Sequence, residues 1–222
     1  MFRLRFREKA SQLNKTATHG GRSRTARKAK RSMTRRVQFE TLEDRNLLSA
    51  GPTPVGNEFQ INTYTTGAQA SPAIASSAAG DYVAVWSSAG QDGGGDGVYA
   101  QRYNPAGAAQ GSEFRVNTYT TGDQTAPTVA MDALGDFVVS WQSNGQDGGG
   151  EGIYAQLYNS AGVAQGSEFR VNTYTTSDQT TPKAAMDSGG DFAITWESNG
   201  QDGNLQGIFA QRYNAAGSAQ GS

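Results

Sequence analysis

The sequence has no cysteine in its 222 residues, and its single histidine, His19, lies near the N-terminus. The lack of cysteine excludes disulfide bonds, thiolate metal sites and thiol nucleophiles, and it is compatible with either redox compartment. The lack of histidine after residue 19 removes imidazole as a general acid, a base or a metal ligand from the rest of the chain. No apolar stretch approaches the roughly 18–20 residues that span a bilayer, so we expect no transmembrane segment.

Charge is distributed unevenly along the chain. Residues 1–50 contain fourteen Lys/Arg and four Asp/Glu, residues 51–222 contain five and sixteen, and the net charge is −1. Residues 22–36 hold eight positive charges and almost no apolar side chains, so we expect residues 1–50 to be disordered. Such a segment is typical of a nucleic-acid or membrane-surface tail, or of a solvated or cleaved leader. Nucleic acid is the less favoured partner because no recognisable nucleic-acid-binding fold follows.

The end of the basic segment, residues 39–50, reads FETLEDRNLLSA. It resembles the LEPR-XLL motif, which is found near the N-termini of large bacterial surface and exported proteins. The matching residues are Leu42, Glu43, Arg45, Leu47 and Leu48, and Asp44 stands where the motif has proline. The resemblance implies a sorting or export role for residues 1–50 and an extracellular or cell-surface location. The segment lacks the roughly 7–15-residue apolar region of an ordinary secretory signal.

After a linker at residues 51–57, one block of sequence occurs three times in tandem, without insertion or deletion. The units are residues 58–112, 113–167 and 168–222, and Trp86, Trp141 and Trp196 occupy the same place in each. A period of this size is typical of propellers, solenoids and tandem arrays. We interpret residues 58–222 as one β-repeat domain, which can be a piece of a longer array.

Each unit contains four short strand patterns separated by turn signals. Read from the second unit, they are residues 127–131, 136–142 and 152–158, followed by 168–173 just after the unit boundary. Phe137, Val139 and Trp141 alternate with smaller side chains, which predicts a strand with one aromatic face and one small face, covered on both sides. We interpret Trp86, Trp141 and Trp196 as structural core. Four strands with a tryptophan on the second is the pattern of a propeller blade, and D-x-x-G-D-F-x-x-x-W resembles the first hairpin of many bacterial propeller repeats.

The predicted fold is therefore all-β, with three four-stranded units as blades of a partial β-propeller. A linear β array and a β sandwich are the alternatives. If the blades begin at Pro72, Pro127 and Pro182, residues 58–63 form a fourth strand without its first three, and the third blade lacks its own fourth strand. In a closed propeller these two pieces can meet. Open sheet edges on this body favour self-association.

The most site-like feature is the glycine-rich loop at residues 91–97, QDGGGDG, echoed at 146–152 as QDGGGEG. Calcium prefers several oxygen ligands on a flexible loop, and Asp92 with Asp96, or Asp147 with Glu151, can supply two carboxylates. The third copy, residues 201–207, reads QDGNLQG and lacks the second acid. The alternative is a long hairpin loop in which glycine supplies positive φ and aspartate supplies solubility. That alternative is favoured, so we expect no cofactor, with calcium as the one candidate.

Other patterns favour structural roles. Asp81, Asp136 and Asp191 lie at strand turns, where capping of backbone N–H groups is the expected use of the side chain. The in-strand spacing of the tryptophans, and of Tyr99, Tyr154 and Phe209, favours core over a sugar-binding platform. We identify no catalytic residue. The sequence favours a non-catalytic extracellular repeat protein acting in adhesion, as a surface coat or as a spacer, with an unknown partner. A fragment of a propeller-fold carbohydrate-active enzyme is the alternative.

Overall fold

The computed structural model describes residues 56–221 of the chain. The basic segment and the motif residues Leu42, Glu43, Arg45, Leu47 and Leu48 lie outside the described residues. The part described is built from twelve strands and contains no helix, and hence none that could cross a membrane. The strands are β1 (Gln69–Ser76), β2 (Tyr82–Ala89), β3 (Asp96–Tyr103), β4 (Ala109–Arg115), β5 (Gln124–Met131), β6 (Phe137–Asn144), β7 (Glu151–Tyr158), β8 (Ala164–Arg170), β9 (Gln179–Met186), β10 (Phe192–Asn199), β11 (Gln206–Tyr213) and β12 (Ala219–Gln220).

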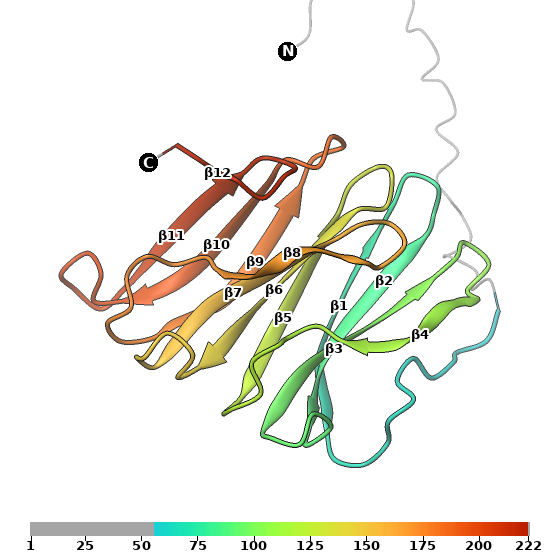
Figure 1. Cartoon of the computed structure of the whole chain (residues 1–222), viewed down its shortest axis with the longest axis horizontal. Coiled ribbons are helices and arrows are strands. Elements are labelled where there is room, and N and C mark those ends of the chain that lie inside the picture. The colour runs from blue at the N-terminus through green and yellow to red at the C-terminus, as the bar shows by residue number, and fades with distance from the viewer. Residues whose placement is uncertain (1–55, 222) are drawn as a thin grey trace, which may run out of the picture. The chain divides into compact units, whose positions relative to one another are not determined.

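The strands form three antiparallel sheets of four, each with its strands in sequence order. We call the sheet β1–β4 blade 1, the sheet β5–β8 blade 2 and the sheet β9–β12 blade 3. Figure 1 shows the three blades one after another, from green at the right to red at the left, with each first strand next to the preceding blade. This confirms the predicted all-β fold of three tandem four-stranded units.

Adjacent blades pack a face of large side chains onto a face of small ones. In blade 2, Phe137, Trp141 and Tyr154 point to blade 1 and contact Val83, Val85 and Val98. The opposite face, with Val138, Ile153 and Ala155, receives Phe192, Ile194 and Trp196 of blade 3. We call these the aromatic face and the small face of a blade. Large side chains on one face fill the space that small ones leave on the other, which is the arrangement that allows close packing of facing layers.

Each first strand carries a β-bulge beside its proline. The register of β1 against β2 shifts between Ala70 and Ala73, and the residue before the proline, Ser71, has φ 52°. The equivalent residues Ala126 and Thr181 have φ 50° and 53°. Proline cannot donate a ladder hydrogen bond, and a bulge takes it out of the regular pairing.

The fourth strand differs from the prediction. Residues 168–173 were expected as the fourth strand of the second blade, whereas β8 runs Ala164–Arg170; the Val171 amide still donates to Ile153 of β7, and the backbone then leaves the sheet. Residues 58–63 form no strand, because their pairing neighbour would be the third strand of a preceding blade. Blade 3 has the first two residues of its fourth strand as β12, paired with Arg212 and Tyr213 of β11. Residues 58–63 and β12 do not pair with each other in this structure.

Candidate functional site

The glycine-rich loop of each blade is a closed hairpin whose first aspartate caps the loop itself. In blade 2 the amide of Gly145 donates to the carbonyl of Gly150 at 2.8 Å. The Asp147 carboxylate accepts the amide of Gly149 at 3.1 Å, and Asp92 does the same for Gly94 at 3.0 Å. The first acid of each proposed calcium pair is therefore already used by its own loop.

The second acid of each pair lies beside an acid from the segment that enters the next blade. We call these segments straps; they are residues 61–68, 116–123 and 171–178, each leading into the first strand of a blade. The amide of Glu151 donates to Asp178 Oδ1 at 3.1 Å, and the amide of Asp96 donates to Asp123 Oδ1 at 3.0 Å. Sequence reasoning missed Asp123 and Asp178. The sequence does contain a recurring Asp-Gln pair at these two places, and the structure buries its glutamine, Gln124 or Gln179.

Burial and like charge disfavour ionisation of these second acids. Burial raises the pKa of Glu151, and the charges of Asp178 and Asp123 raise it further, while the hydrogen bond from Asn144 works in the opposite direction. Burial, with Asp123 and Asp92, also raises the pKa of Asp96. Within residues 56–221 no group of three or more His, Cys, Asp or Glu side chains has an arrangement that could hold a metal ion.

We expect the melting temperature to be the same in EDTA and in millimolar calcium. The physical reason is that Asp92 and Asp147 accept loop amides that calcium would have to displace. A weak site, with a Kd about tenfold below the calcium concentration, would stabilise the chain by about 1.4 kcal/mol. That energy corresponds to a rise of a few degrees in melting temperature. A rise that disappears in the double variant Asp92→Asn with Asp147→Asn would contradict this expectation.

A buried asparagine in each interior strap ties the loop to two blades. Asn172 Oδ1 accepts the amide of Ile153 at 2.7 Å, and its Nδ2 donates to Gln179 Oε1 at 2.9 Å and to Asp147 Oδ2 at 3.3 Å. Asn117 makes the same contacts one repeat earlier, with the amide of Val98 at 2.7 Å. The loops and straps therefore form one hydrogen-bond network that recurs at each junction between blades.

Two of the three strand-turn aspartates, Asp136 and Asp191, cap backbone groups as their position predicts, but the capped turn is distant in sequence. Asp136 Oδ1 accepts the amide of Ser160 at 2.7 Å. Asp191 Oδ1 likewise accepts the amide of Ala215 at 2.9 Å. In blade 1 the residue equivalent to Ser160 is Pro105, which has no amide hydrogen to offer Asp81. The local turn is capped by a different side chain, Asp132, which receives the amides of Leu134 and Asp136.

The tryptophans and their neighbours are core side chains. Trp86, Trp141 and Trp196 are all buried, as are Tyr99 and Tyr154, and Phe209 is half-buried. The indole Nε1 of each tryptophan is buried without a protein hydrogen-bond acceptor. These rings face the adjacent blade or, in blade 1, Ile61 of the strap. The tryptophan and tyrosine rings are therefore covered, and of this set the half-buried Phe209 alone keeps part of its surface in solvent.

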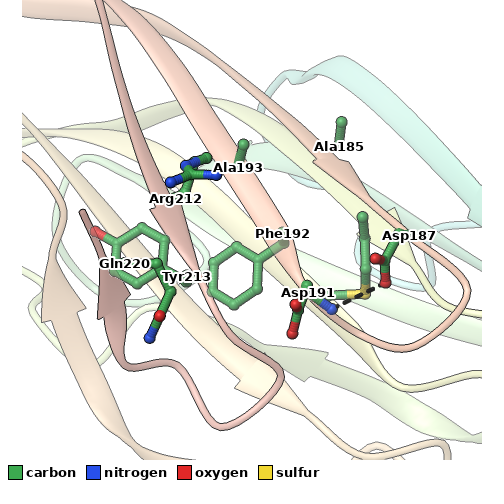
Figure 2. Close-up of a pocket in the computed structure, with 9 residues that line it drawn as sticks. Ala185, Asp187, Asp191, Phe192, Ala193, Arg212, Tyr213 and Gln220 are labelled. Carbon is green, nitrogen blue, oxygen red and sulfur yellow. Dashed lines mark hydrogen bonds between the residues drawn. The ribbon is translucent and has the colours of Figure 1, made fainter.

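A pocket lies on blade 3, where β9 and β11 end and β10 begins. Its volume is about 470 Å³, and Phe192, Tyr213, Asp191, Arg212 and Gln220 line it. Figure 2 shows the Phe192 and Tyr213 rings side by side, with centroids 4.8 Å apart, and the Asp191 amide bonded to Asp187 at 3.1 Å. In blade 1 the equivalent pocket of about 320 Å³ is partly closed by residues of blade 2, including Met131 and Ser160. The blade 3 pocket is thus a junction that lacks its second wall.

Two tyrosines buried at blade junctions are predicted to make stability fall at alkaline pH. Burial raises the pKa of Tyr213 to about 12, and burial, with the Glu168 charge, raises the pKa of Tyr158 still further. Above pH of about 10 the unfolded chain loses these protons and the folded chain does not, so folding loses free energy as pH rises through that range. Denaturant midpoints at pH 8 and pH 11 should show the loss, and Tyr158→Phe should reduce it. An equal loss in the variant would contradict the assignment to Tyr158.

No protein-family model matches the sequence, and no curated protein is similar to it. Solved structures with a similar backbone include the following three. A protein of unknown function from Dyadobacter fermentans is 19% identical, with a TM-score of 0.46, over 64% of this chain and 36% of that one. An endo-arabinase from Bacteroides thetaiotaomicron is 15% identical, with a TM-score of 0.44, over 71% of this chain and 60% of that one.

The third structure is an alpha-L-arabinofuranosidase from Podospora anserina in complex with cellotriose. It is 13% identical, with a TM-score of 0.25, over 69% of this chain and 66% of that one. The chain spans about a third to two thirds of the length of these three structures. All three scores are below 0.5, so the fold assignment depends on the strand order and blade packing described above.

Proposed function

We propose that the repeat body is a non-catalytic structural module of an extracellular or cell-surface protein, acting in adhesion, as a surface coat or as a spacer. The resemblance of residues 39–50 to the LEPR-XLL motif supports export. Leu42, Glu43, Arg45, Leu47 and Leu48 are the residues proposed to carry the sorting signal. Self-association through open sheet edges belongs to the same proposal, since a coat or a spacer is built from copies.

The observation that supports a structural role most strongly is the use of carboxylates within the repeat. Glu113 Oε2 accepts the amide and the hydroxyl of Thr63 at 2.6 and 2.9 Å, and its Oε1 accepts Gln91 Nε2 at 2.6 Å. Glu168 holds Thr118 and Gln146 in the same way one repeat later. Blades 1 and 2 therefore use an equivalent glutamate to join the strap, the loop and the fourth strand. A catalytic pair needs two carboxylates whose surroundings differ.

The export step is tested with a reporter fused to residues 1–50. The reporter should leave the cytoplasm, and Arg45→Ala with Leu47→Ala should retain it inside. Arg22→Ala with Arg24→Ala removes two positive charges from the same segment without touching the motif, and it should leave export unchanged. Equal export of all three fusions would remove the motif from the proposal.

The non-catalytic role is tested on the purified chain with plant and bacterial polysaccharides as substrates. We expect no release of reducing sugar above the buffer control. The contrary result is turnover by the parent chain that disappears when one carboxylate within residues 56–221 is replaced. That result would contradict the structural role and favour a carbohydrate-active enzyme.

A further inference from the structure

The two terminal faces of the described blade stack are only partly covered, and they are complementary: on blade 1 the strap covers Trp86 and Tyr99 but leaves Ile74 exposed. The small face of blade 3 presents Ile208, which is 75% exposed, whereas its equivalents Val98 and Ile153 are 0% exposed beneath the next blade. At the other end, Ile74 on the aromatic side of blade 1 is largely exposed, whereas its equivalent Val129 is buried. The stack thus ends in one small face and one aromatic face, which are the two faces that meet at each internal junction.

The segment before blade 1 already has the geometry of a fourth strand for a preceding blade. Phe59 packs edge-on against Tyr103 with ring centroids 5.6 Å apart at 60°. Phe114 contacts Tyr158 at 5.5 Å and 56°, and Phe169 contacts Tyr213 at 5.5 Å and 59°. Phe114 and Phe169 also belong to a fourth strand, paired with Ala100 and Ala155 of the third strand. Phe59 is 54% exposed and has no strand beside it.

We propose that a second copy of this chain docks head-to-tail, with its blade 1 on the small face of blade 3. This rests on the proposed structural role and deepens it by naming the partner and the surface. Residues 58–60 of the second copy then continue β12 as the fourth strand of blade 3. Phe59 of the second copy pairs with Ala210, as Phe114 pairs with Ala100 and Phe169 with Ala155. The new junction is a third instance of an interface that the chain already makes twice.

The constant offset between units supplies partners for the polar groups at the new junction. Thr63 and Thr118 donate to Glu113 and Glu168, so Thr173 is placed to donate to Glu58 of the second copy. Gln201 is placed to donate to the same carboxylate, as Gln91 and Gln146 do in their own units. The Oε1 atom of Gln201 is buried and without a partner, as is that of Gln91.

Docking also supplies the missing wall of the blade 3 pocket. Between blades 1 and 2, the Arg102 guanidinium donates to the carbonyl of Ser160 at 2.6 Å. Arg212 is the equivalent arginine of blade 3, and it lies exposed in the pocket of Figure 2. The residue equivalent to Ser160 in the second copy is Pro105, whose carbonyl is intact. Arg212 therefore meets a backbone acceptor at the same position.

The glycine-rich loop of blade 3, residues 201–207, fits this junction less well than the equivalent loops of blades 1 and 2. A Cβ atom at Gly94 or Gly149 would overlap the carbonyl oxygen of Thr120 or Thr175 in the next strap. Blade 3 has Asn204 at this place and Leu205 after it, so the loop must shift when the second copy docks. Asn204→Gly with Leu205→Gly restores the glycines of the other blades and should strengthen association.

For the 222-residue chain, the three described blades favour a closed dimer. Propellers close with about four to eight blades, and two copies of three blades give six, whereas three copies give nine. A ring of two copies uses the junction twice and leaves no terminal face. Light scattering on the full chain should give twice the chain mass of 23.4 kDa. A monomer at micromolar concentration, or polymers that lengthen with concentration, would overturn the proposal.

Two sets of variants test the surface and the register. Ile208→Glu changes a side chain that is exposed in the single copy, so the fold should persist and the mass should fall to one chain. Val163→Glu makes the same kind of change at an exposed site on blade 2 and should leave the dimer intact. A dimer that survives Ile208→Glu would overturn the docking surface.

The absence of native cysteine allows a direct test of the register by cross-linking. Opposed residues of paired strands lie about 4.5–5.5 Å apart at Cα, which is within the range of a disulfide. Phe59→Cys with Ala210→Cys in one chain should give a covalent dimer under oxidation, and each single variant should not. Both outcomes can be read while export and hydrolysis are measured separately, so failure of the docking is distinguishable from failure of the proposed role. A non-covalent dimer without the cross-link would overturn the register.

Discussion

Trp141→Ala should destabilise the repeat body by about 3–5 kcal/mol, the usual cost of deleting a large aromatic ring from a core. Trp141 is 0% exposed and packs between blades 1 and 2 in a cluster that includes Val83, Val98 and Val139. Because β6 is paired on both sides, with β5 and β7, the strands around the cavity can relax only in part. Urea unfolding followed by circular dichroism measures the change in the free energy of unfolding.

A control for this variant is Leu134→Ala, which removes a large apolar side chain from an exposed turn of the same blade. It should change the free energy of unfolding by less than about 0.5 kcal/mol. A similar cost for both variants would show that the aromatic face of blade 2 is not the core that the structure describes.

Asn172→Ala should cost about 2–4 kcal/mol, because it leaves buried polar groups without partners. The side chain of Asn172 is fully buried, and it satisfies the amide of Ile153 and the side chain of Gln179. It also donates to the carbonyl of Tyr174 at 2.9 Å, which fixes the bend of the strap. Thermal and urea unfolding of the variant, compared with the parent chain, give the loss.

The matched control is Asn159→Ala at a surface turn of the same blade. Asn159 Oδ1 accepts the amides of Ala161 and Val163 at 3.1 and 2.9 Å, and water can replace it there. This variant should cost about 1 kcal/mol or less. If the two asparagines cost the same, the interior strap network contributes no more than an ordinary turn.

The strands could be predicted because their signals are local. Alternation at Phe137, Val139 and Trp141 and the glycine-rich loops mark β6 and the hairpin after it, and the constant repeat period transfers the assignment to all three units. The fourth strand was placed too late in the second unit, at residue 168 instead of Ala164. Its first residues, including Ala164 and Gly166, have low strand propensity and belong to β8 because β7 lies beside them.

The network at the junctions could not be predicted, because it depends on which repeat lies next to which. Asp178 meets Glu151 across a separation of 27 residues, and Thr118 meets Glu168 across 50. The sequence shows which acids each loop contains, but it does not show which strap lies against that loop. The sequence therefore left the calcium candidates available as ligands, whereas the structure places each of them in contacts with backbone amides or with other acids. These candidates are Asp92, Asp96, Asp147 and Glu151.

The regular spacing of the junction contacts also bears on how the gene can change. Each junction joins residues separated by the same number of positions, as in Asn117 with Val98 and Asn172 with Ile153. Unequal recombination between near-identical units adds or removes whole units, and it rebuilds an existing junction rather than creating a new one. A change in copy number therefore keeps every junction of a kind already present, whereas a one-residue deletion inside a strand moves its side chains to the opposite face.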